Sequence, residues 1–153
     1  MHKFFSLRQV NASIITIGDE LLKTHVSYGP LVQKLLKRFN SSLVTRHSSP
    51  GIKGLAHITG GGFIDNIPRV LPKNCDVVIR KNSWDMLPIF KMILEKGGVD
   101  ESELYQVFNM GIGMVAIVSA DKAKDALHFI KVQKHNAWII GEVVKGTGKA
   151  RVK

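Results

Sequence analysis

Three consecutive glycines, Gly60-Gly61-Gly62, lie between a short apolar run and a segment that can form a helix. A backbone without Cβ atoms turns sharply and presents its amide N–H groups without steric obstruction. Where such a loop precedes a helix, the amides and the partial positive charge of the helix start favour a bound phosphate group. Glycine runs also occur in ordinary turns. The pattern therefore leaves two interpretations, a phosphate-binding loop or a plain turn.

The composition restricts the class of protein. With 153 residues, 44% of them hydrophobic, the chain is long enough for one globular domain. Its longest apolar stretch, 111–120, is too short to span a bilayer, and the first residues lack the features of a secretory signal. A single cysteine, Cys75, excludes an internal disulfide and a thiolate metal cluster. We therefore expect a cytoplasmic protein.

The positive charge is a second constraint on function. The formal net charge is +10, with 22 Lys and Arg residues against 12 Asp and Glu, and this excess favours anionic partners. The cations are scattered, and few aromatic residues lie between them to stack on bases. We interpret most of them as a solvated surface and expect phosphorylated small molecules rather than nucleic acid as ligands. Nucleic-acid binding is an alternative that rests on charge alone.

Strand-like and helix-like segments alternate along the chain, which predicts a layered α/β or α+β domain. Short β-rich or apolar runs predict strands, the third of them buried on both faces, at 54–59, 75–80, 113–119 and 138–144. Helical spacing and capping residues predict helices at 27–39, 63–71, 87–96, 100–107 and 119–132. Pro68 either kinks the second helix or opens a new turn, and Ser119 caps the last. A polar loop is expected at 41–51.

Two blocks of the sequence resemble one known family. The runs Gly54–Gly62 and Asn66–Pro72 closely resemble a signature of the aminoimidazole ribonucleotide (AIR) synthetases, the phosphoribosylformylglycinamidine cyclo-ligases of purine biosynthesis. The run Phe108–Met114 resembles that family's other glycine-rich signature, with weaker similarity from Thr16–Leu22 to Ala137–Gly141. The resemblance covers most of this chain but only the C-terminal half of the family's polypeptide.

The resemblance implies a fold and a division of the chain. The implied fold is α/β (α+β), with helices packed on a mixed β-sheet. We assign residues 16–145 to an AIR synthetase C-terminal-like domain. Residues 1–15 match nothing in the family and form an unassigned N-terminal arm. Residues 146–153 form a basic tail, which we expect to be mobile.

The resemblance also implies an ATP-dependent ring closure. In that family the formyl amide oxygen of formylglycinamidine ribonucleotide is phosphorylated, the amidine nitrogen attacks, and loss of phosphate leaves aminoimidazole ribonucleotide. ATP and Mg²⁺ are the implied cofactors, with no metal ligand assigned in this chain. The implied partners are the ribonucleotide substrate, an ATP-binding N-terminal domain in cis or in trans, and a second copy in a full-length homodimer. We expect this chain alone not to catalyse the full reaction.

The candidate phosphate-binding residues follow from the glycine run and its flanks. The backbone amides of Gly60, Gly61 and Gly62 are the first candidates, and the hydroxyl of Thr59 adds a donor. Arg69 supplies positive charge if its helical phase brings it to the loop. The alternative for Arg69 is a surface cation that bonds the loop or a helix end.

Two further residues of the same signature are candidates. His57 lies within an apolar run, where a lone histidine is commonly structural. The resemblance places it beside the substrate cleft and implies a binding or acid–base role, for which histidine is suited because it ordinarily titrates near neutral pH. Asn66 either hydrogen-bonds the substrate's amide or amidine or only fixes the loop.

The second glycine-rich block supplies weaker candidates. Gly111 and Gly113 permit close approach of a ligand or another chain segment, and Asn109 is a polar contact in the same loop. A tight turn that leads into the next strand is the alternative. We expect Asp65 and Asp76 to be solvated or capping residues rather than metal ligands, and Trp84 and Trp138 to pack in the core or at an edge.

Several function classes lack support. The sequence contains no P-loop motif, no Ser/His/Asp or Cys/His arrangement and no His/Cys cluster with zinc spacing. The leading alternative to a cyclo-ligase is a stand-alone, non-catalytic module that binds a phosphate-bearing ligand or regulates. Another enzyme of the superfamily, such as selenophosphate synthetase or a hydrogenase maturation factor, is a further alternative, against which the intact Asn66–Pro72 block argues.

Overall fold

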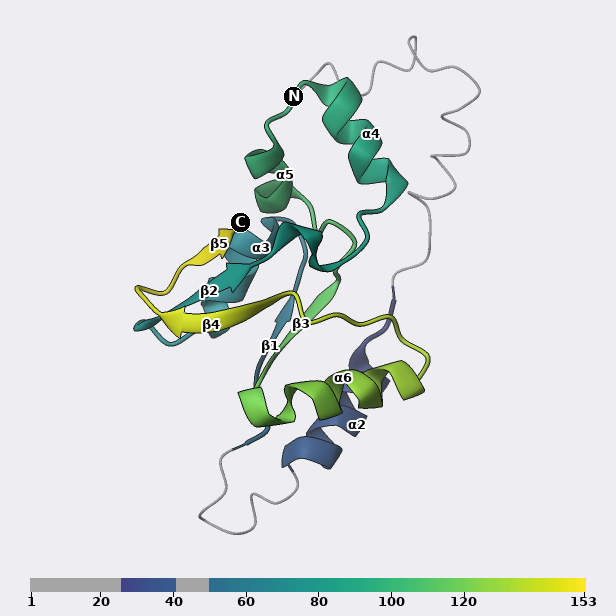
Figure 1. Cartoon of the computed structure of the whole chain (residues 1–153), viewed down its shortest axis with the longest axis vertical. Helices are drawn as coiled ribbons and strands as arrows, with labels where there is room; N and C mark the ends of the chain where they lie inside the picture. Colours follow the sequence, from purple (N-terminus) through teal and green to yellow (C-terminus); the bar gives the residue numbers. More distant parts are fainter. Residues whose placement is uncertain (1–25, 41–49) are drawn as a thin grey trace.

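The computed structural model describes residues 26–40 and 50–153, in which strands form two sheets (Figure 1). One sheet pairs β1 (Ile52–His57) with β3 (Met114–Val118), and the other has the order β4-β2-β5. The strands of the second sheet are β2 (Cys75–Ile79), β4 (Gly141–Lys145) and β5 (Ala150–Val152). The helices are α2 (Gly29–Asn40), α3 (Gly62–Asn66), α4 (Pro88–Gly97), α5 (Glu101–Val107) and α6 (Ala123–Val132), with 3-10 turns η3 (Ile67–Val70), η4 (Lys81–Ser83) and η5 (Ala120–Lys122). The predicted mixed α/β class is confirmed.

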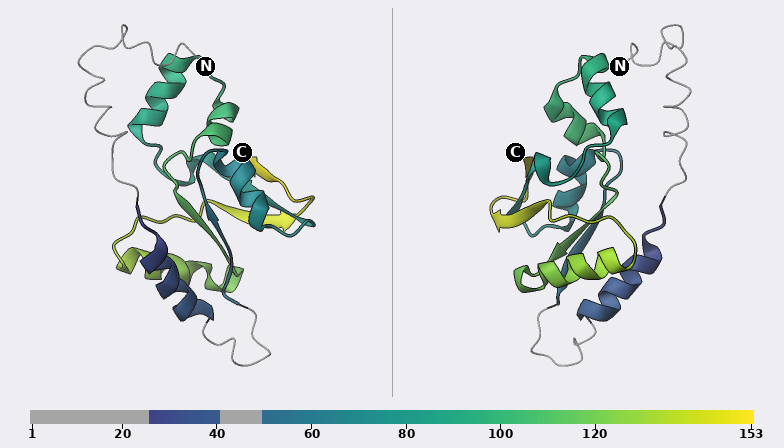
Figure 2. Two further views of the ribbon diagram at one scale, coloured as in Figure 1. Left: turned by 180° about the vertical axis from the view of Figure 1, so that it is seen from behind. Right: turned by 45° about the vertical axis from the view of Figure 1, so that its right-hand side comes forward.

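The two-stranded sheet stands next to the helix pair α2 and α6. Strand β1 runs antiparallel to β3, with His57 opposite Met114. Helices α2 and α6 lie side by side in both views of Figure 2, and the rings of Phe39 and Phe129 meet edge to face at 5.8 Å. An apolar cavity of about 510 Å³ lies between these helices and β3. The prediction that β3 is buried on both faces is wrong, because each of its residues is only half-buried in a sheet of two strands.

The three-stranded sheet is built around β2. Strand β4 is antiparallel to β2, with Cys75 opposite Lys145, and β5 is parallel to it on the other side, with Val77 opposite Ala150. The chain therefore crosses the start of β2 on its way from β4 to β5. The prediction that the tail at 146–153 is mobile is wrong, because residues 150–152 form a hydrogen-bonded strand of the sheet. Strand β4 also begins later than predicted, at Gly141.

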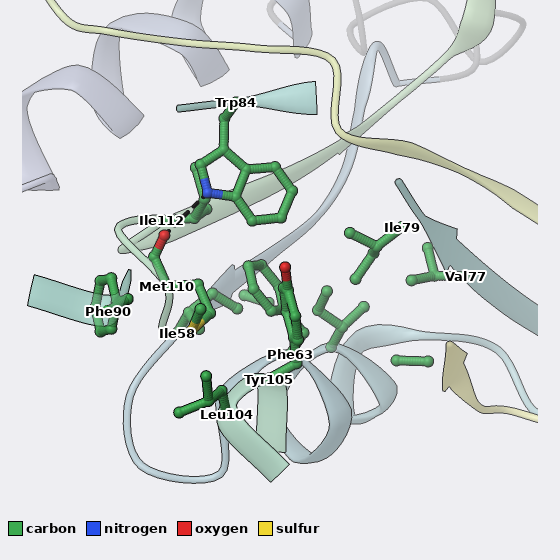
Figure 3. Packing of buried hydrophobic residues seen from close by; sticks show 13 residues of the cluster. Ile58, Phe63, Val77, Ile79, Trp84, Phe90, Leu104, Tyr105, Met110 and Ile112 are labelled. Carbon is green, nitrogen blue, oxygen red and sulfur yellow. Dashed lines mark hydrogen bonds between the residues drawn. The ribbon is translucent and has the colours of Figure 1, made fainter. Parts of the chain in front are cut away.

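Aromatic rings form the centre of the main core (Figure 3). The ring of Phe63 lies 5.6 Å from that of Trp84 and 6.2 Å from that of Tyr105. The indole nitrogen of Trp84 donates a buried hydrogen bond of 2.9 Å to the main-chain oxygen of Met110. The core thus joins α3, α5 and the loop before β3, and Trp84 packs in it as predicted. Trp138 lies outside this core and is 39% exposed.

The helices show which local signals decide their limits. Helix α4 ends at a left-handed Gly98, and α5 spans Glu101–Val107, as predicted. Asp100 makes no side-chain cap, however, and the N–H of Glu103 bonds its main-chain oxygen. Ser119 is no side-chain cap either, because its hydroxyl donates to the main-chain oxygen of Pro50. Pro68 opens the separate turn η3.

Two expectations fall on residues that the structure does not describe. These are the N-terminal arm at 1–15 and most of the polar loop at 41–51. In the part of the chain that is described, no helix is both long and apolar enough to cross a membrane.

Candidate functional site

The glycine run forms a tight turn that leads directly from β1 into α3. The N–H of Gly62 donates to the main-chain oxygen of Thr59 at 3.0 Å, and the N–H of Asp65 donates to that of Gly61 at 3.0 Å. Gly61 and Gly62 have φ angles of 95° and 52°, in the left-handed region that favours glycine. The turn thus exists because of residues that carry no Cβ.

Gly62 serves packing rather than ligand contact. It is buried, and a Cβ at this position would collide with the main-chain oxygen of Tyr105 and lie 2.8 Å from that of Phe108. Helix α5 therefore approaches α3 so closely that only glycine fits. Because the N–H of Gly62 is already bonded to Thr59, its amide is not presented to a phosphate.

Asn66 holds the loop from inside. Its side chain is buried, and its Nδ2 donates to the main-chain oxygens of Gly62, Gly60 and Thr59 at 2.8, 3.2 and 3.4 Å. Three carbonyl groups share the two hydrogens of one amide. The Nδ2 group is thus fully engaged in fixing the loop, which is the second of the two roles considered for this residue.

The direction of these carbonyl groups determines where the amides point. The described residues contain no cis peptide bond, and in a trans peptide the N–H points opposite to the C=O. Since the carbonyls of Thr59 and Gly60 turn towards Asn66, the N–H groups of Gly60 and Gly61 point away from it. Neither N–H has an acceptor among the described residues. Gly60 is exposed, and no atom lies within 4 Å of its Cβ position.

Two charged side chains flank the loop. A Cβ on Gly61 would lie 2.8 Å from the Cβ of Asp65 and 3.0 Å from its Oδ2, so this carboxylate lies against the loop. Arg69 is exposed in η3, and none of the ion pairs among the described residues includes it. The site therefore combines two outward amides with one acid beside them and one cation a turn further along the chain.

His57 occupies the last position of β1, next to the loop. Its side chain is exposed. Its imidazole lies 6.1 Å from the ring of Tyr28, edge to face. Tyr28 is half-buried at the start of α2, and burial raises the pKa of its hydroxyl. The sequence analysis did not identify Tyr28 as a site residue, because no local pattern predicts its contact with His57 at the distant end of β1.

Gly113 belongs to the same cluster. Its carbonyl accepts the N–H of Ile58 at 2.9 Å, which extends the β1–β3 pairing beyond His57. A Cβ on Gly113 would overlap the hydroxyl of Tyr28 and lie 2.9 Å from its Cζ. The absent side chain thus admits Tyr28.

The other block, 109–111, is a tight turn. The Oδ1 of Asn109 accepts the N–H of Gly111, and its main-chain oxygen accepts the N–H of Ile112, both at 2.9 Å. Met110 and Gly111 have φ angles of 52° and 90°. The hydrogen bond from Trp84 to Met110 fixes this turn to the core (Figure 3). Asn109 and Gly111 therefore support the approach to β3 and Gly113.

Of the two roles expected for Asp76, solvated or capping, the structure supports capping. It is 2% exposed, and its Oδ1 accepts the N–H groups of Thr147 and Lys149 at 2.7 and 2.8 Å. Its Oδ2 pairs with Arg151 at 2.7 Å. The bonds from Lys149 and Thr147, and then the charge of Arg151, hold the pKa of Asp76 below its ordinary value. The carboxylate thus closes the loop between β4 and β5.

The described residues do not form a metal centre. In residues 26–40 and 50–153, no group of three or more His, Cys, Asp or Glu side chains could hold a metal ion. Since Mg²⁺ is commonly held by one or two carboxylates together with substrate phosphates, this finding concerns only a site that the protein would form by itself.

Comparisons with known proteins identify a shared domain. The family model described as AIR synthase related protein, C-terminal domain, matches residues 13–153. The phosphoribosylformylglycinamidine cyclo-ligase of Geobacillus thermodenitrificans is 46% identical over 134 residues, which cover 88% of this chain and 36% of the relative. That of Syntrophus aciditrophicus is 45% identical over 134 residues, covering 88% and 35%. The chain thus spans about a third of the length of these relatives.

A solved structure shares the fold. The hydrogenase maturation protein HypE of E. coli superposes with a TM-score of 0.58 and 23% sequence identity, over 92% of this chain and 41% of that one. A second HypE structure gives a TM-score of 0.55 at 22% identity. At this level of identity the similarity concerns the fold alone.

Proposed function

Because this chain belongs to the AIR synthase related proteins and contains their C-terminal domain, we propose that it acts as the C-terminal half of a phosphoribosylformylglycinamidine cyclo-ligase. The proposed reaction is the ATP-dependent closure of formylglycinamidine ribonucleotide to aminoimidazole ribonucleotide, in the cytoplasm. The observation that supports it is the glycine loop, whose Gly60 and Gly61 amides point away from Asn66 and have no acceptor among the described residues.

In this proposal the loop binds an oxyanion of the phosphorylated substrate. The two N–H groups donate to phosphate oxygens, and the exposed Thr59 hydroxyl adds a donor. Because Asn66 holds the amides in place before the ligand arrives, binding does not have to order them. Arg69 supplies positive charge from the adjacent turn. Asp65 accepts from the cationic amidine of the same substrate.

His57 is the proposed acid–base residue. It is exposed at the end of the strand that leads into the loop, three positions before Gly60. Ring closure requires a proton to leave the attacking amidine nitrogen, and a neutral imidazole can accept it. The remaining demand is to fold the substrate so that its ends meet, which rigid backbone contacts favour.

ATP and Mg²⁺ belong to the proposal as cofactors of the complete enzyme. We assign ATP binding and the metal ligands to an N-terminal half, in cis or in trans, and expect a homodimer of the full-length protein. On this proposal the 153 residues alone bind a phosphate-bearing ligand and do not turn it over.

A graft tests the proposal. The chain replaces the matched C-terminal region of the Geobacillus thermodenitrificans relative, and ATP-dependent formation of aminoimidazole ribonucleotide is measured. We expect activity in the graft, a loss of about a hundredfold with His57→Ala, and weaker substrate binding with Gly60→Val, which blocks the amides. Lys124→Ala, an exposed change on α6, is the control.

The outcomes separate the proposal from its rival. A folded graft that binds ATP but forms no product would overturn the cyclo-ligase assignment. If such a graft still bound the ribonucleotide at the loop, a non-catalytic phosphate-binding module would take its place. Turnover by the isolated chain would contradict the need for an N-terminal half.

A further inference from the structure

We infer that Tyr28 is a positioning residue, which holds the imidazole of His57 in one orientation. We also infer that position 113 is a glycine because a side chain there would displace the tyrosine. The effect of Tyr28 on catalysis rests on the proposed function, whereas its effect on the orientation of the His57 ring does not. Tyr28 lies outside both glycine-rich blocks, and its role follows from three contacts.

The first contact is between the two rings. The centroids of Tyr28 and His57 are 6.1 Å apart, with an angle of 66° between the ring planes. Edge-to-face packing at this distance favours one orientation of each ring. His57 is exposed at the end of β1, so packing against a half-buried ring limits its rotation on that side.

The second contact holds the tyrosine. Its hydroxyl lies so close to the Cβ position of residue 113 that any side chain there would collide with it, and the Cζ is 2.9 Å from the same position. Gly113 in turn accepts the N–H of Ile58, the residue after His57. One glycine therefore contacts both the backbone next to His57 and the side chain that packs on its ring.

The third contact connects the pair to α2. The main-chain oxygen of Tyr28 accepts the N–H of Val32, so the residue opens the helix. Its side chain also lines the apolar cavity beside β3. The orientation of His57 is thereby coupled to the position of the α2 N-terminus, and a shift of that helix moves the proposed acid–base group.

The test uses the full 153-residue chain and NMR signals of the His57 ring protons followed against pH. The chain has six histidines, so a His57→Gln variant identifies the signals. Tyr28→Leu removes the ring and is expected to move the His57 chemical shifts. Phe39→Leu is the matched control, because Phe39 lies on α2, the helix that follows Tyr28, but packs against Phe129.

A second pair of variants tests the role of the hydroxyl. Tyr28→Phe keeps the ring and is expected to leave the His57 signals near their wild-type positions. Tyr105→Phe removes a hydroxyl in the core, away from this pair, and is its control. A His57 shift in Tyr28→Phe as large as that in Tyr28→Leu would assign the effect to the hydroxyl and overturn ring packing as the cause.

A double-mutant cycle tests whether Gly113 acts on His57 through Tyr28. Gly113→Ala places a methyl group against the Tyr28 hydroxyl, so it is expected to move the His57 signals. In the Tyr28→Leu background the same change is expected to add little, because residues in contact are coupled. Equal shifts in both backgrounds would overturn the inference, since Gly113 would then act through Ile58 alone.

Activity of the graft supplies a separate readout. Tyr28→Leu is expected to lower kcat roughly tenfold to a hundredfold with little change in KM, because it misorients a group without removing a substrate contact. If the graft lacks cyclo-ligase activity but the double-mutant cycle measured by NMR shows coupling, the proposed function is refuted and the positioning of His57 by Tyr28 still holds. An uncoupled cycle in an active graft would refute only the positioning.

Discussion

Two glycine-containing loops of this molecule have opposite hydrogen-bonding character. The loop at 59–62 closes over Asn66, which donates to its carbonyl oxygens. The loop at 146–149 closes over Asp76, which accepts from its amides. In the first loop the amides of Gly60 and Gly61 are left to face outward.

In the second loop every amide is used. Thr147 and Lys149 donate to Asp76, while Gly146 and Gly148 donate to the main-chain oxygens of Asn74 and Cys75 at 2.9 Å. Glycine content and nearby lysines therefore do not identify an anion site. The buried side chain beneath the loop does, because a donor there frees amides and an acceptor consumes them.

The largest expected effect separates the two roles of glycine within the first loop. Gly62→Ala brings a methyl group into the main-chain oxygen of Tyr105 at a left-handed backbone position, so we expect a loss of about 3–5 kcal/mol or failure to fold. Gly60→Ala meets no atom within 4 Å and is its control, within about 1 kcal/mol of wild type. Chemical denaturation measures both. Equal losses would contradict the packing role of Gly62.

The next prediction replaces the hydrogen-bond donor beneath the first loop by an acceptor. Asn66→Asp replaces the buried Nδ2 donor by a carboxylate oxygen that faces three carbonyl oxygens, so we expect a loss of about 3 kcal/mol and of phosphate binding. Asn109→Asp is the matched control, because Asn109 uses its Oδ1 as an acceptor, which aspartate keeps. Thermal unfolding and titration with inorganic phosphate are the measurements. Wild-type phosphate affinity in Asn66→Asp would contradict the claim that a buried donor beneath the loop makes its amides available to an anion.

The acid dependence of stability tests the second loop. The pKa of Asp76 is lower in the folded chain than in the unfolded one, so its contribution is present above the unfolded pKa, about 3.9, and is lost as pH falls through the folded pKa. Asp76→Asn is expected to lower Tm by roughly 5–10 °C at pH 7, with a smaller deficit as the pH approaches the folded value. Phosphate binding at Gly60 stays unchanged. A deficit independent of pH would contradict the ionised role.

The smallest effect concerns the charge beside the first loop. Asp65 is exposed against Gly61, so Asp65→Asn removes a repulsion and is expected to tighten inorganic phosphate binding roughly threefold to tenfold at low salt. Asp121→Asn, an exposed acid in η5, is the control. Weaker phosphate binding in Asp65→Asn would mean that this carboxylate supports the loop.

Much of the fold was predictable from local patterns. The helix limits at Gly98 and Val107, the turn opened by Pro68 and strand β2 follow from backbone preferences within a few residues. Expectations that required distant partners were less successful. Ser119 bonds Pro50 instead of capping α6, and residues 150–152 join β2 instead of forming a tail.

Local sequence patterns indicate that a strand, three glycines and a short helix follow one another, and that this block resembles a cyclo-ligase signature. They do so because glycine geometry and apolar periodicity are local properties of the chain. The purpose of each glycine, in contrast, depends on the packing of distant segments. Gly62 accommodates α5, Gly113 accommodates Tyr28, and Gly60 is left open. Those differences come from backbone and side-chain atoms that are distant in sequence and meet only when the chain folds.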